Sequence, residues 1–300
     1  MLFPLPRPSK APPRIVVTGA GIVTALGIGW RANADGFRAG RQAFRPVTLF
    51  DVSRQRAKIA AEVDLPQPFP RLKLSEKRLS RLDRATKMLL LAVQEAWSQA
   101  GLTAGENLPL VLGTISGGMA LAEIYLRHAL CSPQCRRQQA TRVINYQAQR
   151  QALDVCDVFD LSGPITVISN ACASSANAIG HAWELLRAGH AEQALTGGHD
   201  ALCQLTFAGF DSLQVISPTP CRPFDTRRDG LSLGEGAAIL VLETLDHARR
   251  RSAEILGEII SYAAATDTYH LTQPQPQGDT AFTTMKTACA RANITPEQVD

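Results

Sequence analysis

Short apolar runs alternate along the chain with longer segments in which apolar residues recur every three or four positions. Runs rich in Ile, Val and Leu predict buried strands, and they cover residues 15–18, 110–113, 165–169, 193–196, 237–243 and 255–262. The periodic segments predict amphipathic helices over residues 31–40, 80–100, 141–159, 173–188 and 280–293. Because strands and helices alternate, the pattern predicts a layered α/β fold.

Glycines are predicted to end several of these elements. Gly101 should end the second helix, and Gly19 and Gly197 should each break a strand. The Gly19-Ala20-Gly21 segment lacks the third small residue of a dinucleotide fingerprint, because Thr24 stands at that position. We therefore interpret it as a turn at which the backbone passes close to a neighbouring element.

Composition supports an ordinary folded chain. Hydrophobic residues make up 45% and charged residues 19% of the 300 positions, which excludes disordered and coiled-coil proteins. The net charge of +4, from 31 basic and 27 acidic residues, is too small to indicate a nucleic-acid partner. No apolar run is long enough for a membrane helix, so we expect no membrane partner.

The cysteines and the start of the chain suggest a location. The seven cysteines form no short disulfide framework, which favours free thiols in a reducing compartment. Residues 1–13 are proline-rich and lack the apolar segment of a signal peptide. We expect these residues to form a disordered tail and the protein to be cytoplasmic.

Two cysteine-containing segments are candidates for chemistry. His128, Cys131 and Cys135 include metal-binding residue types, but no second ligand pair lies at zinc spacing, so we predict no metal site. Cys172 follows a predicted strand and begins a predicted helix. A helix N-terminus favours the nucleophilic thiolate, and a backbone N–H there can stabilise an oxyanion. The alternative is that Cys172 is a small buried apolar residue.

Several segments resemble one known family, in the family's order. They are residues 169–182 (Ser-Asn-Ala-Cys-Ala-Ser-Ser-Ala-Asn-Ala-Ile-Gly-His-Ala), residues 16–21, the block Arg222-Pro223-Phe224-Asp225, Arg228-Asp229-Gly230 and Gly234-Glu235-Gly236-Ala237, and residues 266–270. Together they resemble the β-ketoacyl-acyl carrier protein synthases, in particular the elongating enzymes of dissociated systems. The resemblance extends over residues 14–300.

The resemblance implies a thiolase-like layered α/β fold. Residues 14–246 would form the N-terminal half with the nucleophile, and residues 247–300 the start of a truncated C-terminal half. Cys172 would accept an acyl group and then undergo decarboxylative condensation with a malonyl-carrier thioester, in fatty-acid or polyene-type lipid synthesis. No cofactor is implied, because the phosphopantetheine arm belongs to the acyl carrier protein. The expected partners are that carrier and a second ketosynthase chain, in a homodimer or heterodimer.

The resemblance also assigns binding residues. Phe210 matches an aromatic residue that lines the acyl pocket in relatives, although it could equally be an ordinary core residue. A basic cluster before the long helix would steer the acidic carrier protein, although such a cluster could also be a solvated surface. Its members are Lys73, Lys77, Arg78, Arg81 and Arg84.

One departure from the family limits the expected activity. The family uses two histidines and a lysine in its second half, and no segment here matches them; His181, His199 and His270 do not substitute for them. We therefore expect these residues alone not to complete a condensation, and we expect exposed apolar surface and poor solubility. The alternatives are a non-catalytic, chain-length-factor-like partner subunit and a degradative thiolase. Cys172 argues against the first and the Gly-Glu-Gly block against the second.

Overall fold

The computed structural model describes residues 12–132, 134, 143–270 and 273–300. Its centre is a mixed β-sheet with the strand order β2-β1-β8-β7-β5-β6, and β9 also pairs with β1. The strands are β1 (Ile15–Thr24), β2 (Gly27–Ile28), β5 (Leu110–Gly113), β6 (Ile165–Ile168), β7 (Gln193–Asp200), β8 (Gly236–Thr244) and β9 (Gly257–Ile259). Strand β5 runs parallel to β6 and β7, and the other pairs are antiparallel. Strands β3 (Arg45–Pro46) and β4 (Ile59–Ala60) form a separate small sheet.

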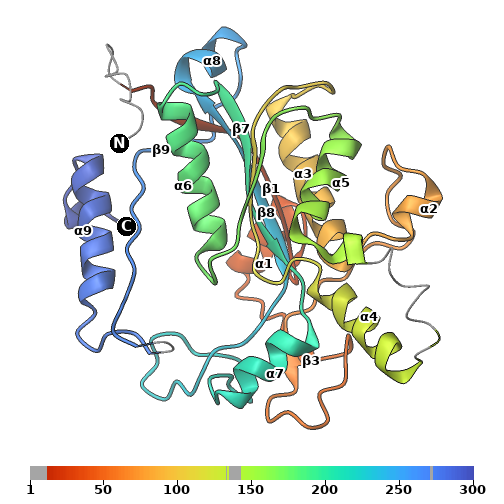
Figure 1. The fold of residues 1–300 in the computed structure, drawn as a ribbon. Helices are drawn as coiled ribbons and strands as arrows, with labels where there is room; N and C mark the ends of the chain where they lie inside the picture. Colours follow the sequence, from red (N-terminus) through yellow and green to blue (C-terminus); the bar gives the residue numbers. More distant parts are fainter. Residues whose placement is uncertain (1–11, 133, 135–142, 271–272) are drawn as a thin grey trace, which may run out of the picture.

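Helices cover both faces of the central sheet (Figure 1). They are α1 (Trp30–Arg38), α2 (Glu76–Leu79), α3 (Arg84–Ala100), α4 (Met119–Cys131), α5 (Ala148–Phe159), α6 (Ser174–Arg187), α7 (Gln204–Ser212), α8 (Leu245–Arg250) and α9 (Asp279–Ala292). Helices α3 and α5 lie on one face of the sheet and α6 on the other. The predicted layered α/β fold is confirmed.

Each face of the sheet has its own apolar core. On the α3 and α5 face, Leu89 and Val155 pack with the β8 residues Ile239 and Val241. On the α6 face, Ala182 and Leu186 pack with Leu242 from β8. Alternate β8 residues therefore serve opposite cores, which explains the nearly continuous apolar sequence of this strand.

The predicted strand breaks at glycine are wrong. Strand β1 continues through Gly19 and Gly21 to Thr24, and β7 continues through Gly197 to Asp200. A Cβ on Gly19 would lie 2.3 Å from the carbonyl oxygen of Ala96, and one on Gly21 would lie 1.9 Å from that of Ala92. These glycines therefore allow α3 to approach the sheet closely. The expected close approach is confirmed, although the expected turn is not there.

The helix boundaries follow local capping groups. Helix α3 begins at Arg84 rather than at residue 80, because the Asp83 carboxylate accepts the N–H of Thr86 at 2.6 Å and caps the helix. It ends at Gly101 as predicted, where φ is +64°. Helix α5 begins at Ala148. The predicted start of this helix at residues 141–142, and residues 1–11 of the predicted tail, lie outside the described residues.

The C-terminal segment has no buried residue after Ala248 among the described residues. Helix α9 has no buried residue, and its Phe282 and Met285 are 61% and 63% exposed. Trp183 on α6 donates its indole N–H to the carbonyl of Ile259 at 2.7 Å and so attaches this segment to the main body. Exposed apolar surface is therefore present, as expected. Among the described residues, no helix combines the length and apolarity that a bilayer span requires.

Candidate active site

Cys172 lies in the short turn between β6 and α6. Cys172 is an exposed residue, so the alternative that it is a small buried apolar residue is wrong. Helix α6 begins two residues later, at Ser174, with Ala173 as its N-cap. The preceding residue, Ala171, has φ +61°, a conformation that non-glycine residues rarely adopt. The thiol is thus presented to solvent just before a helix N-terminus.

Two glycines bring the start of α6 close to the sheet. A Cβ on Gly113, at the end of β5, would lie 2.4 Å from the Ser174 carbonyl group and from the N of Ser175. A Cβ on Gly198, in β7, would lie 1.8 Å from the Ser175 hydroxyl oxygen. Neither position has room for a larger residue. The end of the sheet therefore forms the base under the Cys172 turn.

Asp200 organises the loop that follows β5. Its carboxylate accepts the Thr114 hydroxyl at 2.8 Å and the N–H groups of Ile115 and Ser116 at 3.0 and 2.7 Å. Burial raises the pKa of Asp200, and these hydrogen bonds oppose the rise. The sequence reading missed this residue. The available signal was its position two residues after Gly197-Gly198, which follow a predicted strand.

A buried polar chain connects α3, α5 and β7. The side-chain amide of Gln151 donates to Asp83 at 2.7 Å, and its oxygen lies 2.6 Å from Nε2 of His199. Because that oxygen is an acceptor, Nε2 of His199 carries the proton. The other ring nitrogen, Nδ1, is buried without a hydrogen-bond partner among the described residues. Burial lowers the pKa of His199 to about 4 and raises that of Asp83.

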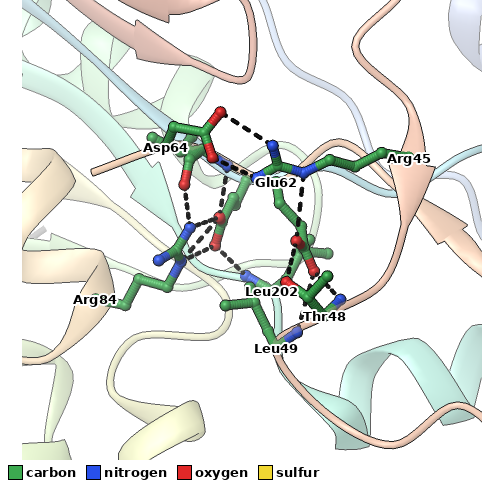
Figure 2. Close-up of polar contacts among 9 residues, drawn as sticks. Arg45, Thr48, Leu49, Glu62, Asp64, Arg84 and Leu202 are labelled. Carbon is green, nitrogen blue, oxygen red and sulfur yellow. Dashed lines mark hydrogen bonds and ion pairs between the residues drawn. The ribbon is translucent and has the colours of Figure 1, made fainter. Parts of the chain in front are cut away.

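Figure 2 shows a second polar cluster, in which Arg45, Glu62, Asp64 and Arg84 lie close together. Glu235 of the Gly-Glu-Gly motif belongs to this cluster through its ion pair with Arg84. Glu235 accepts the N–H of Val63 at 2.8 Å, the N–H of Leu202 at 3.1 Å and the Arg84 guanidinium at 2.5 Å. Its side chain is completely buried. The motif therefore joins the start of α3 to loops that are distant in sequence.

Glu62 forms the neighbouring part of this cluster. Burial acts to raise the pKa of Glu62, but the N–H and hydroxyl of Thr48 and the N–H of Leu49 donate to the carboxylate and lower the pKa overall. Arg45 lies 3.5 Å from the same carboxylate and pairs with Asp64 at 2.6 Å on the outer side. Each of the three carboxylates of the cluster is thus paired with a guanidinium group, and Arg45 is shared by Glu62 and Asp64.

The structure divides the predicted basic cluster. Arg84 is directed inward to Glu235 and its side chain is only 23% exposed, and Arg78 forms ion pairs with Asp154 and Asp157. The members that are exposed and form no ion pair with any other described residue are Lys73, Lys77 and Arg81. Burial raises the pKa of Asp154 to about 6, and Arg78 opposes that rise.

The other predicted residues occupy ordinary positions. Phe210 is half-buried and packs with Phe207 and Ile216 in a small core below the sheet, so its place in an acyl pocket stays a prediction. Cys131 is a free thiol at the end of α4, whereas Cys135 lies outside the described residues. Across the described ranges, no group of three or more His, Cys, Asp or Glu residues is arranged to hold a metal.

Comparison with known families identifies the class of protein. The family model for the N-terminal domain of β-ketoacyl synthases matches residues 13–248. The chain is 34% identical over 300 residues to 3-oxoacyl-[acyl-carrier-protein] synthase 2 of Coxiella burnetii, covering 96% of this chain and 71% of that protein. It is also 33% identical over 292 residues to the tetracenomycin polyketide synthase ketoacyl synthase alpha subunit of Streptomyces glaucescens, covering 88% of this chain and 66% of that protein.

Solved structures agree with this assignment. The ishigamide ketosynthase/chain length factor aligns with a TM-score of 0.89 at 30% identity, over 97% of this chain and 72% of that chain. A β-ketoacyl synthase from Burkholderia phymatum aligns with a TM-score of 0.82 at 31% identity, over 94% and 71%. The fold is that of the thiolase-like condensing enzymes. The chain belongs to the β-ketoacyl synthase family, whose members include both fatty-acid and polyketide synthases.

Proposed function

We propose that this chain performs the acyl-transfer stage of a 3-oxoacyl-[acyl carrier protein] synthase, with Cys172 as the nucleophile. The observation that carries the proposal is the exposed Cys172 thiol in its Asn-Ala-Cys-Ala turn ahead of α6. The thiolate attacks the carbonyl carbon of an acyl-carrier thioester. The bond between that carbon and the sulfur of the carrier's phosphopantetheine arm breaks, and the departing thiolate takes up a proton.

The complete family reaction has a second stage. A malonyl-carrier thioester loses carbon dioxide, and the resulting carbanion attacks the acyl group on Cys172. The Cys172 thiolate leaves, and the product is a 3-oxoacyl thioester longer by the two malonyl-derived carbons. Because no segment of this chain matches the family's two histidines, we expect these residues alone to be acylated without condensing.

Mass spectrometry tests the acyl transfer directly. After incubation with an acyl-carrier thioester, we expect one acyl adduct on the peptide that contains Cys172 and none in Cys172→Ala. Cys131 is also exposed and free, so Cys131→Ala is the matched control and should retain the adduct. A wild-type protein that acquires no adduct at Cys172 would contradict the proposal.

A non-catalytic partner subunit is the second candidate function. The similarity to the ishigamide ketosynthase/chain length factor supports it, because a chain of this fold could pair with a complete ketosynthase. Such a subunit needs no nucleophile, whereas Cys172 is present and exposed. Failure of Cys172 to be acylated, together with stable association with a complete ketosynthase, would favour this candidate.

The carrier-protein surface that we propose consists of Lys73, Lys77 and Arg81. All three side chains are exposed, and no ion pair to another described residue neutralises them. Exposed positive charge attracts an acidic carrier and accelerates encounter. Arg78 and Arg84 are excluded from this surface because each is already paired with a buried carboxylate, Asp154 and Glu235 respectively.

Charge reversal tests this surface. We expect Lys77→Glu with Arg81→Glu to weaken carrier binding about tenfold at low salt, and by less at high salt because exposed charges are screened. The binding constant is measured by fluorescence titration with labelled carrier. The exposed Arg249 and Lys286 lie on α8 and α9, so reversing both is a control with the same change in net charge. Equal affinity in the two double variants would exclude the proposed surface.

A further inference from the structure

The turn that carries Cys172 is held in an unfavourable backbone conformation. Ala171 has φ +61°, where its Cβ crowds the backbone. Such a conformation persists only when surrounding contacts enforce it, and it occurs preferentially at functional sites. A nearby group must therefore hold Ala171 at positive φ.

The side chain of Ser174 closes the turn. Its hydroxyl oxygen accepts the N–H of Asn170 at 2.9 Å and donates to the carbonyl of Ala171 at 2.6 Å. The N–H of Ser174 also donates to the Ala171 carbonyl, at 3.1 Å. Ser174 is only 3% exposed, so water cannot easily replace its hydroxyl.

The position of Ser174 is itself fixed from below. A Cβ on Gly113 would lie 2.4 Å from the Ser174 carbonyl group, so the end of β5 packs directly against this residue. The hydroxyl therefore connects the end of β5, through Ser174, to Asn170 and Ala171 in the strained turn. Cys172 follows the two backbone groups that the Ser174 hydroxyl binds, the Asn170 N–H and the Ala171 carbonyl, and it precedes helix α6.

We propose that Ser174 is a positioning residue for Cys172, because its hydroxyl holds Ala171 at positive φ and thereby fixes the direction of the thiol. The inference rests on the proposed function of Cys172 as an acyl acceptor. Without the hydroxyl, the Asn170 N–H loses its partner and Ala171 relaxes toward negative φ. A nucleophile displaced by about 1 Å reacts about a hundredfold more slowly.

A rescue experiment tests this role. We expect Ser174→Ala to slow acylation of Cys172 by a small acyl thioester about 10- to 100-fold. Adding Ala171→Gly should restore most of the rate, because glycine adopts positive φ without steric cost. A merely structural serine would not be rescued at this neighbour. Ser212 on α7 donates to the carbonyl of Gly209 at 2.7 Å, so Ser212→Ala removes a similar bond elsewhere and should leave the rate unchanged.

Different outcomes identify different failures. Unchanged acylation in Ser174→Ala, or a double variant no faster than Ser174→Ala, overturns the positioning role. If iodoacetamide alkylates Cys172 in the wild-type protein but no acyl thioester acylates it, the proposed function fails instead. The positioning role is then tested by the rate of alkylation. Ser174→Ala should slow the alkylation of Cys172, and the double variant should restore its rate. If Ser174→Ala does not fold, Ala171→Gly alone should still raise the midpoint of thermal unfolding, and a lowered midpoint would show that the turn is not strained.

Discussion

Replacing Glu235 by Gln is expected to lower the free energy of unfolding by about 3–5 kcal/mol, the usual cost of breaking a buried ion pair. The Glu235 side chain has no exposed surface, and its carboxylate accepts from Val63, Leu202 and Arg84. The substitution leaves the Arg84 guanidinium without its counter-charge. It also places the NH₂ group of the glutamine side chain, which can only donate, against groups that are themselves hydrogen-bond donors. Denaturant unfolding near neutral pH measures the loss.

A matched variant separates the buried carboxylate from the surface pairs of the same cluster. Asp64 has a 78% exposed side chain and pairs with Arg45, so Asp64→Asn should cost only about 0–1 kcal/mol. Adding Arg84→Met to Glu235→Gln should recover part of the lost stability, because the uncompensated charge is removed. Equal losses in Glu235→Gln and Asp64→Asn would show that the cluster is not buried as described.

The second large effect is a pH dependence that arises from His199. Burial lowers its pKa to about 4, whereas an unfolded histidine titrates near 6.5. The unfolded chain therefore binds more protons between these values, and the stability contributed by neutral His199 is complete above about pH 6.5 and lost as pH falls toward 4. From about pH 7 to about pH 4.5, the wild type should lose about 2–3 kcal/mol relative to His199→Gln, which can still donate to Gln151.

A carboxylate of opposite behaviour provides the control. The pKa of Asp154 is raised to about 6 by burial, so its folded form binds more protons than the unfolded form below that pH. Relative to Asp154→Asn, the wild type should therefore gain stability as pH falls from about 6 toward about 4. Unfolding curves are compared between each variant and the wild type at several pH values, because the two groups partly cancel in the wild type alone. If the free energies of unfolding of the wild type and His199→Gln change equally between about pH 7 and about pH 4.5, His199 is not a buried neutral residue.

Local sequence determined much of the layered fold. Strand β5 matches its predicted bounds, residues 110–113, because an apolar run between two turns has few other stable conformations. Helix α3 ends at Gly101 as predicted, because only a residue that tolerates positive φ can terminate a helix in this way. The motif around Cys172 indicated both the family and an accessible thiol, and both hold.

Tertiary structure decided what depended on distant neighbours. Gly19 and Gly21 were predicted to end a strand, but they lie within β1 because α3, about 75 positions later in the sequence, packs against them. Arg84 was predicted to be on the surface, but it turns inward because Glu235 lies across the fold from it. Likewise, the positive φ of Ala171 occurs where Gly113 of β5 packs against Ser174, a contact between segments that are far apart in the sequence. Backbone propensity and periodicity act over a few residues, whereas close packing and charge pairing depend on which segments meet in space, and the chain establishes that only when it folds.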